Sequence, residues 1–202
     1  MNPFVICNRP GFLCKKNGVN RFEFEFTLGS SRCGGGDTCD LTKIITLNIF
    51  SLLYELNKDI YERVEIERTA AEDAVVDTEE GQVLLIMNHL FKDLGLPKKH
   101  SCLHVTISPL PTDINTDINR KRVRISATPR DYVCPDGDVK TVPVGLESFV
   151  CDIISSDDGA TLQASAALTL KSNVHIPPFL EKILGQILYK IFSRISQFFS
   201  KL

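Results

Sequence analysis

Cys102 and His104 are the residues whose types and spacing come nearest to a nucleophilic pair. They lie two residues apart on a predicted strand, so their side chains share one face and could touch. A Cys/His nucleophile also needs a third group that orients the base, and a site that stabilises an oxyanion. The sequence shows neither, so we expect no catalytic residues and no enzymatic activity.

The sequence also contains little evidence for a metal or cofactor site. Cys7, Cys14, Cys33 and Cys39 could supply four thiolates. Structural zinc sites, however, usually space each pair of ligands two to four residues apart, and both spacings here are wider. The sequence contains no phosphate-binding, dinucleotide-binding or metalloprotease motif. We expect free thiols, no metal and no cofactor.

A basic cluster, Arg120-Lys121-Arg122-Val123-Arg124, could contact phosphate groups of a nucleic acid or a lipid. No aromatic residue is interleaved with these cations for stacking on bases. The net charge of the whole chain is −2. The cluster is therefore interpreted as the solvated face of a strand, and nucleic acid as an unlikely partner.

Composition describes an ordinary globular chain of 202 residues, of which 43% are hydrophobic. Its seven cysteines are an odd number spread through a chain large enough to form its own core, which favours a reducing, intracellular compartment. No apolar stretch reaches the roughly 18 to 20 residues of a membrane span. The N-terminus lacks the basic region of a signal peptide. We expect a single α+β domain spanning residues 1–202.

The N-terminal half is predicted to hold one strand and two helices. Residues 1–20 are interpreted as an irregular arm, and 22–26 alternate strictly as in a half-buried strand. Apolar residues at helical spacing predict a helix from Leu41 to about Arg63, and a second one over Glu80–Leu94. Between them, residues 65–80 are acidic and are expected to form a frayed helix end or a loop.

After Pro97 the apolar period changes from helical to alternating, which predicts strands over 103–108, 122–128, 142–154 and 161–174. The link Ser155–Gly159 is a good hairpin signal. The chain then ends in the strongest amphipathic pattern in the sequence, a helix over 177–202. Its apolar stripe contains Phe179, Leu180, Ile183, Leu184, Ile187, Leu188, Ile191, Phe192, Ile195, Phe198, Phe199 and Leu202.

This order of elements resembles the helix-grip fold of the START-like (SRPBCC) superfamily. The local likeness lies in Leu162-Gln163-Ala164, Leu170 and Ile176-Pro177-Pro178-Phe179, followed by a helix with Ile183-Leu184 and Ile187-Leu188. The resemblance implies an antiparallel sheet with the C-terminal helix packed on it, and a cavity between them for a lipid-like or other apolar ligand. It carries over no ligand-contacting motif.

Two hypotheses of function follow. The first is a noncatalytic binding protein for a hydrophobic small molecule, with a pocket lined by Leu168, Leu170, Ile183, Leu184, Ile187 and Ile191. The alternative is a structural or assembly subunit that docks on a protein partner or a membrane surface through its N-terminal segments and the end of the C-terminal helix. The contact residues would then be Lys190, Arg194, Phe198, Phe199 and Lys201.

Overall fold

A computed structural model of the chain describes residues 3–30, 40–69, 77–90, 92–111, 120–132, 141–174 and 176–202. The strands form one curved sheet whose order is β1-β2-β3-β10-β9-β7-β6-β5-β4, with β8 paired in parallel to the start of β6. All the other pairings are antiparallel. The strands are β1 (Phe4–Arg9), β2 (Phe12–Lys16), β3 (Arg21–Gly29), β4 (Tyr61–Arg68), β5 (Glu79–Met87), β6 (Lys99–Pro109), β7 (Arg122–Pro129), β8 (Val142–Pro143), β9 (Leu146–Ser155) and β10 (Thr161–Leu170).

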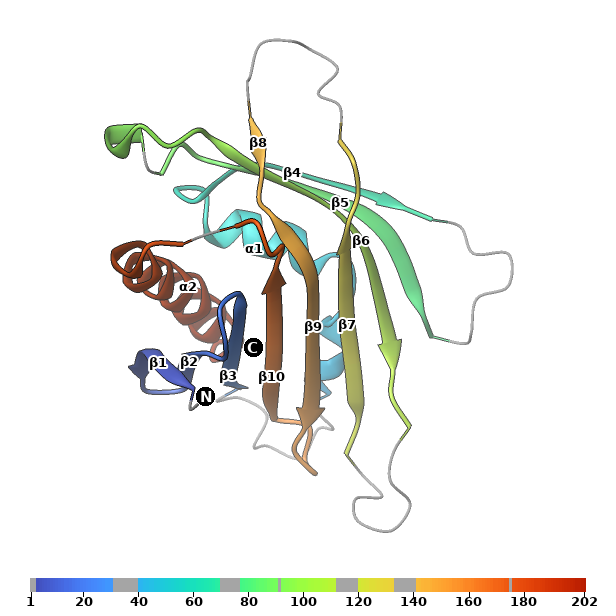
Figure 1. Ribbon diagram of the computed structural model, residues 1–202. Coiled ribbons are helices and arrows are strands. Elements are labelled where there is room, and N and C mark those ends of the chain that lie inside the picture. The colour runs from blue at the N-terminus through green and yellow to red at the C-terminus, as the bar shows by residue number, and fades with distance from the viewer. Residues whose placement is uncertain are drawn as a thin grey trace.

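Two α-helices lie on the inner side of this sheet (Figure 1). The long helix α2 (Pro178–Phe199) packs on β1, β2 and β3, and its C-terminal part meets the short helix α1 (Ile49–Leu56). Two 3-10 turns, η1 (Leu41–Ile44) and η2 (Lys92–Leu94), complete the described helical structure. The predicted architecture, an antiparallel sheet covered by a long C-terminal helix, is confirmed.

The core lies between the sheet and the helices. Cross-strand register places Phe24, Ala166, Cys151 and Ile125 side by side across β3, β10, β9 and β7, and all four are buried. Because side chains alternate across a strand, the residues between them point to the outer face. The inner face of the sheet is consequently apolar over its whole width.

The predicted helix over 80–94 is wrong, because residues 79–87 form strand β5. Val83, Leu84, Leu85 and Ile86 are all at least 91% buried. A strand covered on both faces presents a continuous apolar run without alternation, and such a run also fits the stripe of a buried helix. The described residues of the N-terminal half therefore contain one α-helix instead of two.

The predicted helix over 41–63 is partly correct. It is divided into η1 and α1, which ends at Leu56, after which Asn57 turns the chain. The side-chain amide of buried Asn57 donates to the carbonyl of Leu53, which closes the last turn of the helix. Residues 61–68 then form strand β4 and not a frayed helix end, with Val64 and Ile66 facing the core.

The N-terminal segment over 1–20 is not irregular, since β1 and β2 form a hairpin at the edge of the sheet. Short strands broken by Pro10 and Gly11 leave too few residues for alternation to be visible in the sequence. The strands predicted after Pro97 are present as β6, β7, β9 and β10, although the segment predicted over 142–154 is divided into β8 and β9, and β10 ends at Leu170 and not at 174. The glycine-rich segment 31–39, residues 70–76 and the turn at Pro135–Gly137 lie outside the described residues.

Candidate functional site

The inner face of the central strands provides one wall of the candidate site. Cross-strand register places Leu168 of β10 opposite Phe149 of β9, and Ala127 of β7 beside Phe149. Leu168 and Phe149 contact the core but are only half-buried, although they lie on central strands. The neighbouring row, which contains Ala166 and Cys151, is fully buried. Protein atoms thus cover the wall less completely around Leu168 and Phe149.

Helix α2 presents three faces. Its buried face, which packs on β1, β2 and β3, consists of Glu181, Gly185, Phe192 and Phe199. A second face contains Lys182, Gln186 and Gln197, all exposed to solvent. Successive helical residues are rotated by about 100°, so the third face, opposite the solvent-exposed one, is formed by Leu180, Leu184, Ile187, Ile191 and Ile195. We call this third face the inward arc. Its five side chains are all half-buried.

Aromatic packing holds the buried face of α2 on the N-terminal strands. The ring of Phe192 lies 5.4 Å from that of Phe12 and 4.5 Å from that of Phe26, measured between centroids. Gly185 allows α2 to approach strand β1 closely, because a Cβ atom at position 185 would lie 2.8 Å from Cγ2 of Ile6. The N-terminal hairpin is therefore the main support of α2.

Ion pairs fasten α2 at two places. Near its start, buried Glu181 accepts a hydrogen bond from the Lys16 ammonium group of β2. Further along, Lys190 lies 2.6 Å from a carboxylate oxygen of Asp59, and Arg194 pairs with the same carboxylate. Hydrogen bonds from Arg194 and Lys190 hold the pKa of Asp59 well below its usual range. These contacts fix the rotation of α2 about its own axis.

The predicted pocket residues lie on two elements, strand β10 and helix α2. Leu168 lies on the inner wall, while Leu184, Ile187 and Ile191 lie on the inward arc. Ile183 is half-buried at the edge of that arc. Leu170 is buried at the end of β10. Sequence reasoning did not identify Phe149, although its position in an alternating strand would have placed it on the same face.

The predicted contact surface at the end of α2 needs correction. Phe199 is completely buried and Phe198 is half-buried, with its ring 6.0 Å from that of Phe199. Phe199 is enclosed, whereas Phe198 lines an open hollow between α1 and the end of α2. Lys190 and Arg194 are engaged by Asp59. Lys190 and Lys201 are exposed.

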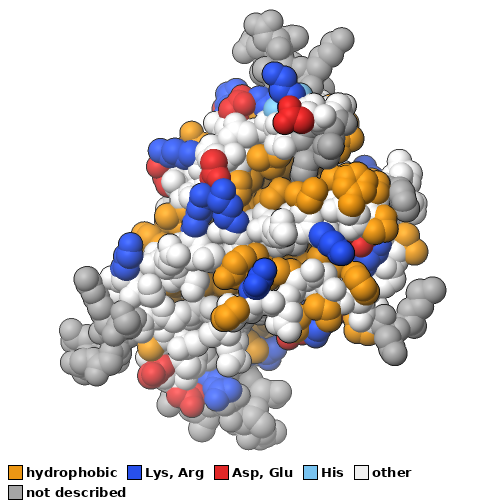
Figure 2. Space-filling view, turned by 90° about the vertical axis from the view of Figure 1, so that its left-hand side faces the viewer, with side chains coloured by type: hydrophobic (Ala, Val, Ile, Leu, Met, Phe, Trp, Pro, Cys, Tyr) orange, Lys and Arg blue, Asp and Glu red, His pale blue; other side chains and the backbone are white. Residues whose placement is uncertain are grey.

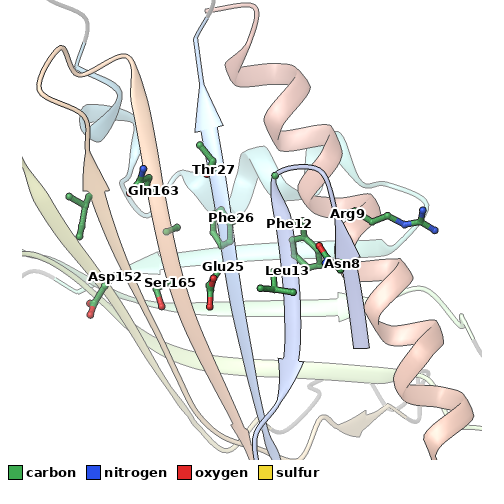
Figure 3. A pocket seen from close by; sticks show the side chains of 13 residues that line it. Asn8, Arg9, Phe12, Leu13, Glu25, Phe26, Thr27, Asp152, Gln163 and Ser165 are labelled. Atoms are coloured by element: carbon green, nitrogen blue, oxygen red, sulfur yellow. The ribbon is translucent and has the colours of Figure 1, made fainter. Parts of the chain in front are cut away.

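Two open hollows lie elsewhere on the described structure, and none of the predicted pocket residues lines either of them. One, of about 480 Å³, opens beside the outer face of β3, β10 and β9 (Figure 3). Glu25, Ser165 and Asp152 form a polar row there, with Glu25 paired to Lys15 and Asp152 to Arg124. The other hollow, of about 500 Å³, lies between α1 and the end of α2. Because the carboxylates in the first hollow are already paired, we assign it no ligand.

The Cys102–His104 pair lacks the features of a reactive site. Burial raises the pKa of the Cys102 thiol, which disfavours the nucleophilic thiolate. The pKa values of Cys14 and Cys151 are raised further by burial, to about 12. Among the described residues, no group of three or more His, Cys, Asp or Glu side chains could hold a metal ion. Cys33, Cys39 and Cys134 lie outside that part of the chain.

Three of the four cations in the basic cluster 120–124 are paired with nearby acids. Arg120 lies 2.9 Å from Asp157, and Lys121 lies 2.5 Å from Asp40. Arg124 makes two hydrogen bonds, of 2.6 and 2.8 Å, to Asp152, which faces it across β7 and β9. These partners support the interpretation of the cluster as a solvated strand face.

Comparison with solved structures gives likenesses over nearly the whole chain. The lipid transfer and protein localization domain of human StarD13 (DLC2) is similar over 100% of this chain and 90% of its own, with a TM-score of 0.61 and 12% identity. Human StAR-related lipid transfer protein 5 has a TM-score of 0.63 at 8% identity, covering 96% of this chain and 85% of its own. A STAR-related lipid transfer protein from Xanthomonas axonopodis has a TM-score of 0.56 at 14% identity, covering 96% and 99%.

Sequence comparison adds nothing to these likenesses, since no protein-family model and no curated protein matches the chain. In its described residues, no helix combines the length and apolar character needed to cross a membrane. The resemblance suggested by the order of elements is nevertheless confirmed at the level of structure. The chain adopts a START-like fold.

Proposed function

We propose that the protein is a noncatalytic binding protein for a hydrophobic, lipid-like molecule that lies between the inward arc of α2 and the inner face of the sheet. The observation that carries this proposal is the incomplete burial of the apolar residues Leu184, Ile187 and Ile191, which lie on the side of α2 away from its solvent-exposed face. An apolar side chain turned toward a core normally reaches full burial. A ligand would cover the surface that these residues leave uncovered.

The chemistry of the two walls favours an apolar ligand. The inward arc contains only Leu and Ile, and the wall opposite consists of residues such as Leu168, Phe149 and Ala127. None of these described residues carries a charge, so a ligand with a charged body would lose hydration there without gaining a partner. The solved neighbours include proteins named for lipid transfer, which agrees with this class of ligand.

A pair of adjacent tryptophan substitutions tests the proposal. Ile187→Trp adds volume to the inward arc, whereas Gln186→Trp adds the same ring on the solvent-exposed face. Purified proteins would be analysed by native mass spectrometry for co-purifying lipids and titrated with a fluorescent phospholipid. Ile187→Trp should weaken phospholipid binding about tenfold, because overpacking typically costs about 1 to 3 kcal/mol. Gln186→Trp should bind like the wild type.

The proposal would be overturned if the wild type neither retained a lipid nor bound the phospholipid probe. It would also fail if both substitutions reduced binding equally. Thermal unfolding of each variant shows whether a loss of binding merely reflects a loss of fold.

The alternative function, assembly through the end of α2, has less support. It relied on exposed rings at Phe198 and Phe199, and the latter is completely buried. Truncation after Arg194 separates the two functions. Removal of Phe199 from the core should destabilise the whole domain, whereas an assembly element should be lost without unfolding.

A further inference from the structure

The most exposed apolar side chains in the described part of the chain belong to four residues. Val19 is 70% exposed, Phe4 59%, Phe179 57% and Val5 48%. The remaining large apolar side chains classed as exposed have values between 36% and 42%. Scattered exposed apolar residues are normal on a soluble protein, and only their clustering calls for an explanation.

These four residues, which we call the apical patch, gather at one end of the molecule. Phe4 pairs with Lys16 in the β1–β2 register, and Val19 lies in the turn that follows Lys16. The Lys16 ammonium group binds Glu181, which follows Phe179 by two residues in the first turn of α2. The start of β1, the β2–β3 turn and the start of α2 therefore meet around the Lys16–Glu181 pair.

Basic residues lie on the elements that form the apical patch. Strands β1 and β2 and helix α2 carry six Lys or Arg residues, of which four are engaged by carboxylates: Lys15 by Glu25, Lys16 by Glu181, and Lys190 and Arg194 by Asp59. Glu181 is buried against Lys16 and presents no charge to an incoming partner. Lys171 and Lys182 are exposed and make no ion pair within the described residues. Lys171 lies next to the β2–β3 turn, because its carbonyl accepts a hydrogen bond from Asn20.

Figure 2 shows the side of the molecule that carries α2, β1 and β2. Hydrophobic side chains form a band across the middle of this face, and Lys and Arg side chains lie among them. Basic and apolar groups thus share the surface, in the manner of proteins that bind membrane interfaces.

The shape of the apical patch favours a bilayer over a protein partner. Its members project from a strand start, a turn and a helix start, so they form a tip and not a groove. A stable protein interface buries about 800 Å² on each partner, more than four side chains provide. A bilayer instead accepts projecting aromatic and aliphatic groups between its headgroups, while nearby lysines attract anionic lipids.

We propose that the apical patch docks the protein on anionic membranes, with Phe4, Val19 and Phe179 inserted among the headgroups and Lys171 and Lys182 bound to their phosphates. This places the membrane contact at the start of α2, at the opposite end from Lys201. The contact would bring the first residues of the inward arc, such as Leu180 and Leu184, close to the bilayer.

Vesicle co-sedimentation of the full chain tests this proposal. The probes are phosphatidylcholine vesicles with and without phosphatidylserine, at low and high salt. The wild type should sediment with the phosphatidylserine vesicles and be released by salt. Combined Phe4→Ser and Phe179→Ser substitutions should weaken binding about tenfold or more, since each exposed ring would lose burial in the interface. Lys182→Glu should weaken it several-fold.

Two matched controls locate the contact. Val142→Ser removes an exposed apolar side chain elsewhere, and Lys201→Glu reverses a charge at the other end of α2; both should bind like the wild type. The proposal is wrong if the wild type ignores phosphatidylserine vesicles, or if Lys201→Glu reduces binding as much as Lys182→Glu. A lipid-free dimer abolished by the double Phe substitution would assign the patch to a second copy of the chain instead.

Failure of the membrane proposal can be distinguished from failure of the proposed ligand site. The double Phe variant should still retain its co-purifying lipid in native mass spectrometry, because neither ring belongs to the inward arc. Loss of both the lipid and vesicle binding in that variant would contradict separate sites.

Discussion

Replacement of Phe192 by Ala tests how α2 is held on the sheet. Phe192 is 93% buried, and its ring packs against the rings of Phe12 and Phe26. Removing a buried phenylalanine ring typically costs about 3 to 5 kcal/mol, as transfer free energy and as a cavity that neighbours fill only in part. Such a loss is a large fraction of the roughly 5 to 15 kcal/mol that stabilises a typical domain.

The assay is urea unfolding followed by far-UV circular dichroism, which suits a chain without tryptophan. With a slope of about 2 to 3 kcal/mol per molar urea, Phe192→Ala should lower the midpoint by about 1.5 M. Phe179→Ala is the matched control on the same helix, and its exposed ring should contribute less than about 0.5 kcal/mol. If Phe192→Ala cost less than about 1 kcal/mol, or no more than Phe179→Ala, the described docking of α2 would be refuted.

Three further predictions concern the fastening of α2 and the thiols. Asp59→Asn should destabilise the domain by about 1 kcal/mol near pH 6, since the ion pairs are partly exposed. The pKa of Asp59 is lowered in the folded state, so its contribution is present above about pH 4 and is lost as pH falls. Urea titrations should therefore show the difference between wild type and Asp59→Asn shrinking toward pH 3, and a constant difference would contradict the pairing. Gly185→Leu should destabilise by about 1 to 3 kcal/mol in thermal or urea unfolding, because a Cβ atom already lies 2.8 Å from Ile6; unchanged stability would exclude the close approach. Cys14 and Cys151 should resist alkylation in the folded protein at pH 8 and react in urea, as peptide mapping would show, whereas rapid native labelling would contradict their burial.

The polar outer face of the sheet also has a consequence for binding. Glu25 and Asp152 flank Ser165 across three strands, but each carboxylate already has a cation partner. Hydrogen bonds from Arg124 lower the pKa of Asp152, so this carboxylate stays charged and paired at neutral pH. These outer-face carboxylates are thus satisfied within the protein, and the proposed ligand site is the inner face.

Local sequence patterns determined many of the strands of this protein and its long C-terminal helix. Alternating apolar and polar residues predicted a strand over Phe22–Phe26 and the strands after Pro97, each with its apolar residues on one face. The apolar stripe near the C-terminus predicted helix α2. These elements suffice for the START-like resemblance because period and order are properties of the sequence itself. The same patterns placed Leu168, Leu184, Ile187 and Ile191 on apolar faces.

Only the tertiary structure decided which other elements those apolar faces contact. The apolar run of β5 reads equally well as a helix until strands on both sides bury it. The rotation of α2 depends on Lys16 and Asp59, which are distant in sequence and carry no local signal of their partners. Burial of Phe199 and exposure of Phe179, two similar residues of one amphipathic helix, likewise depend on where α1 and the N-terminal hairpin pack. Long-range contacts, which chain folding creates and no short window of sequence contains, set the boundary between core, ligand wall and surface.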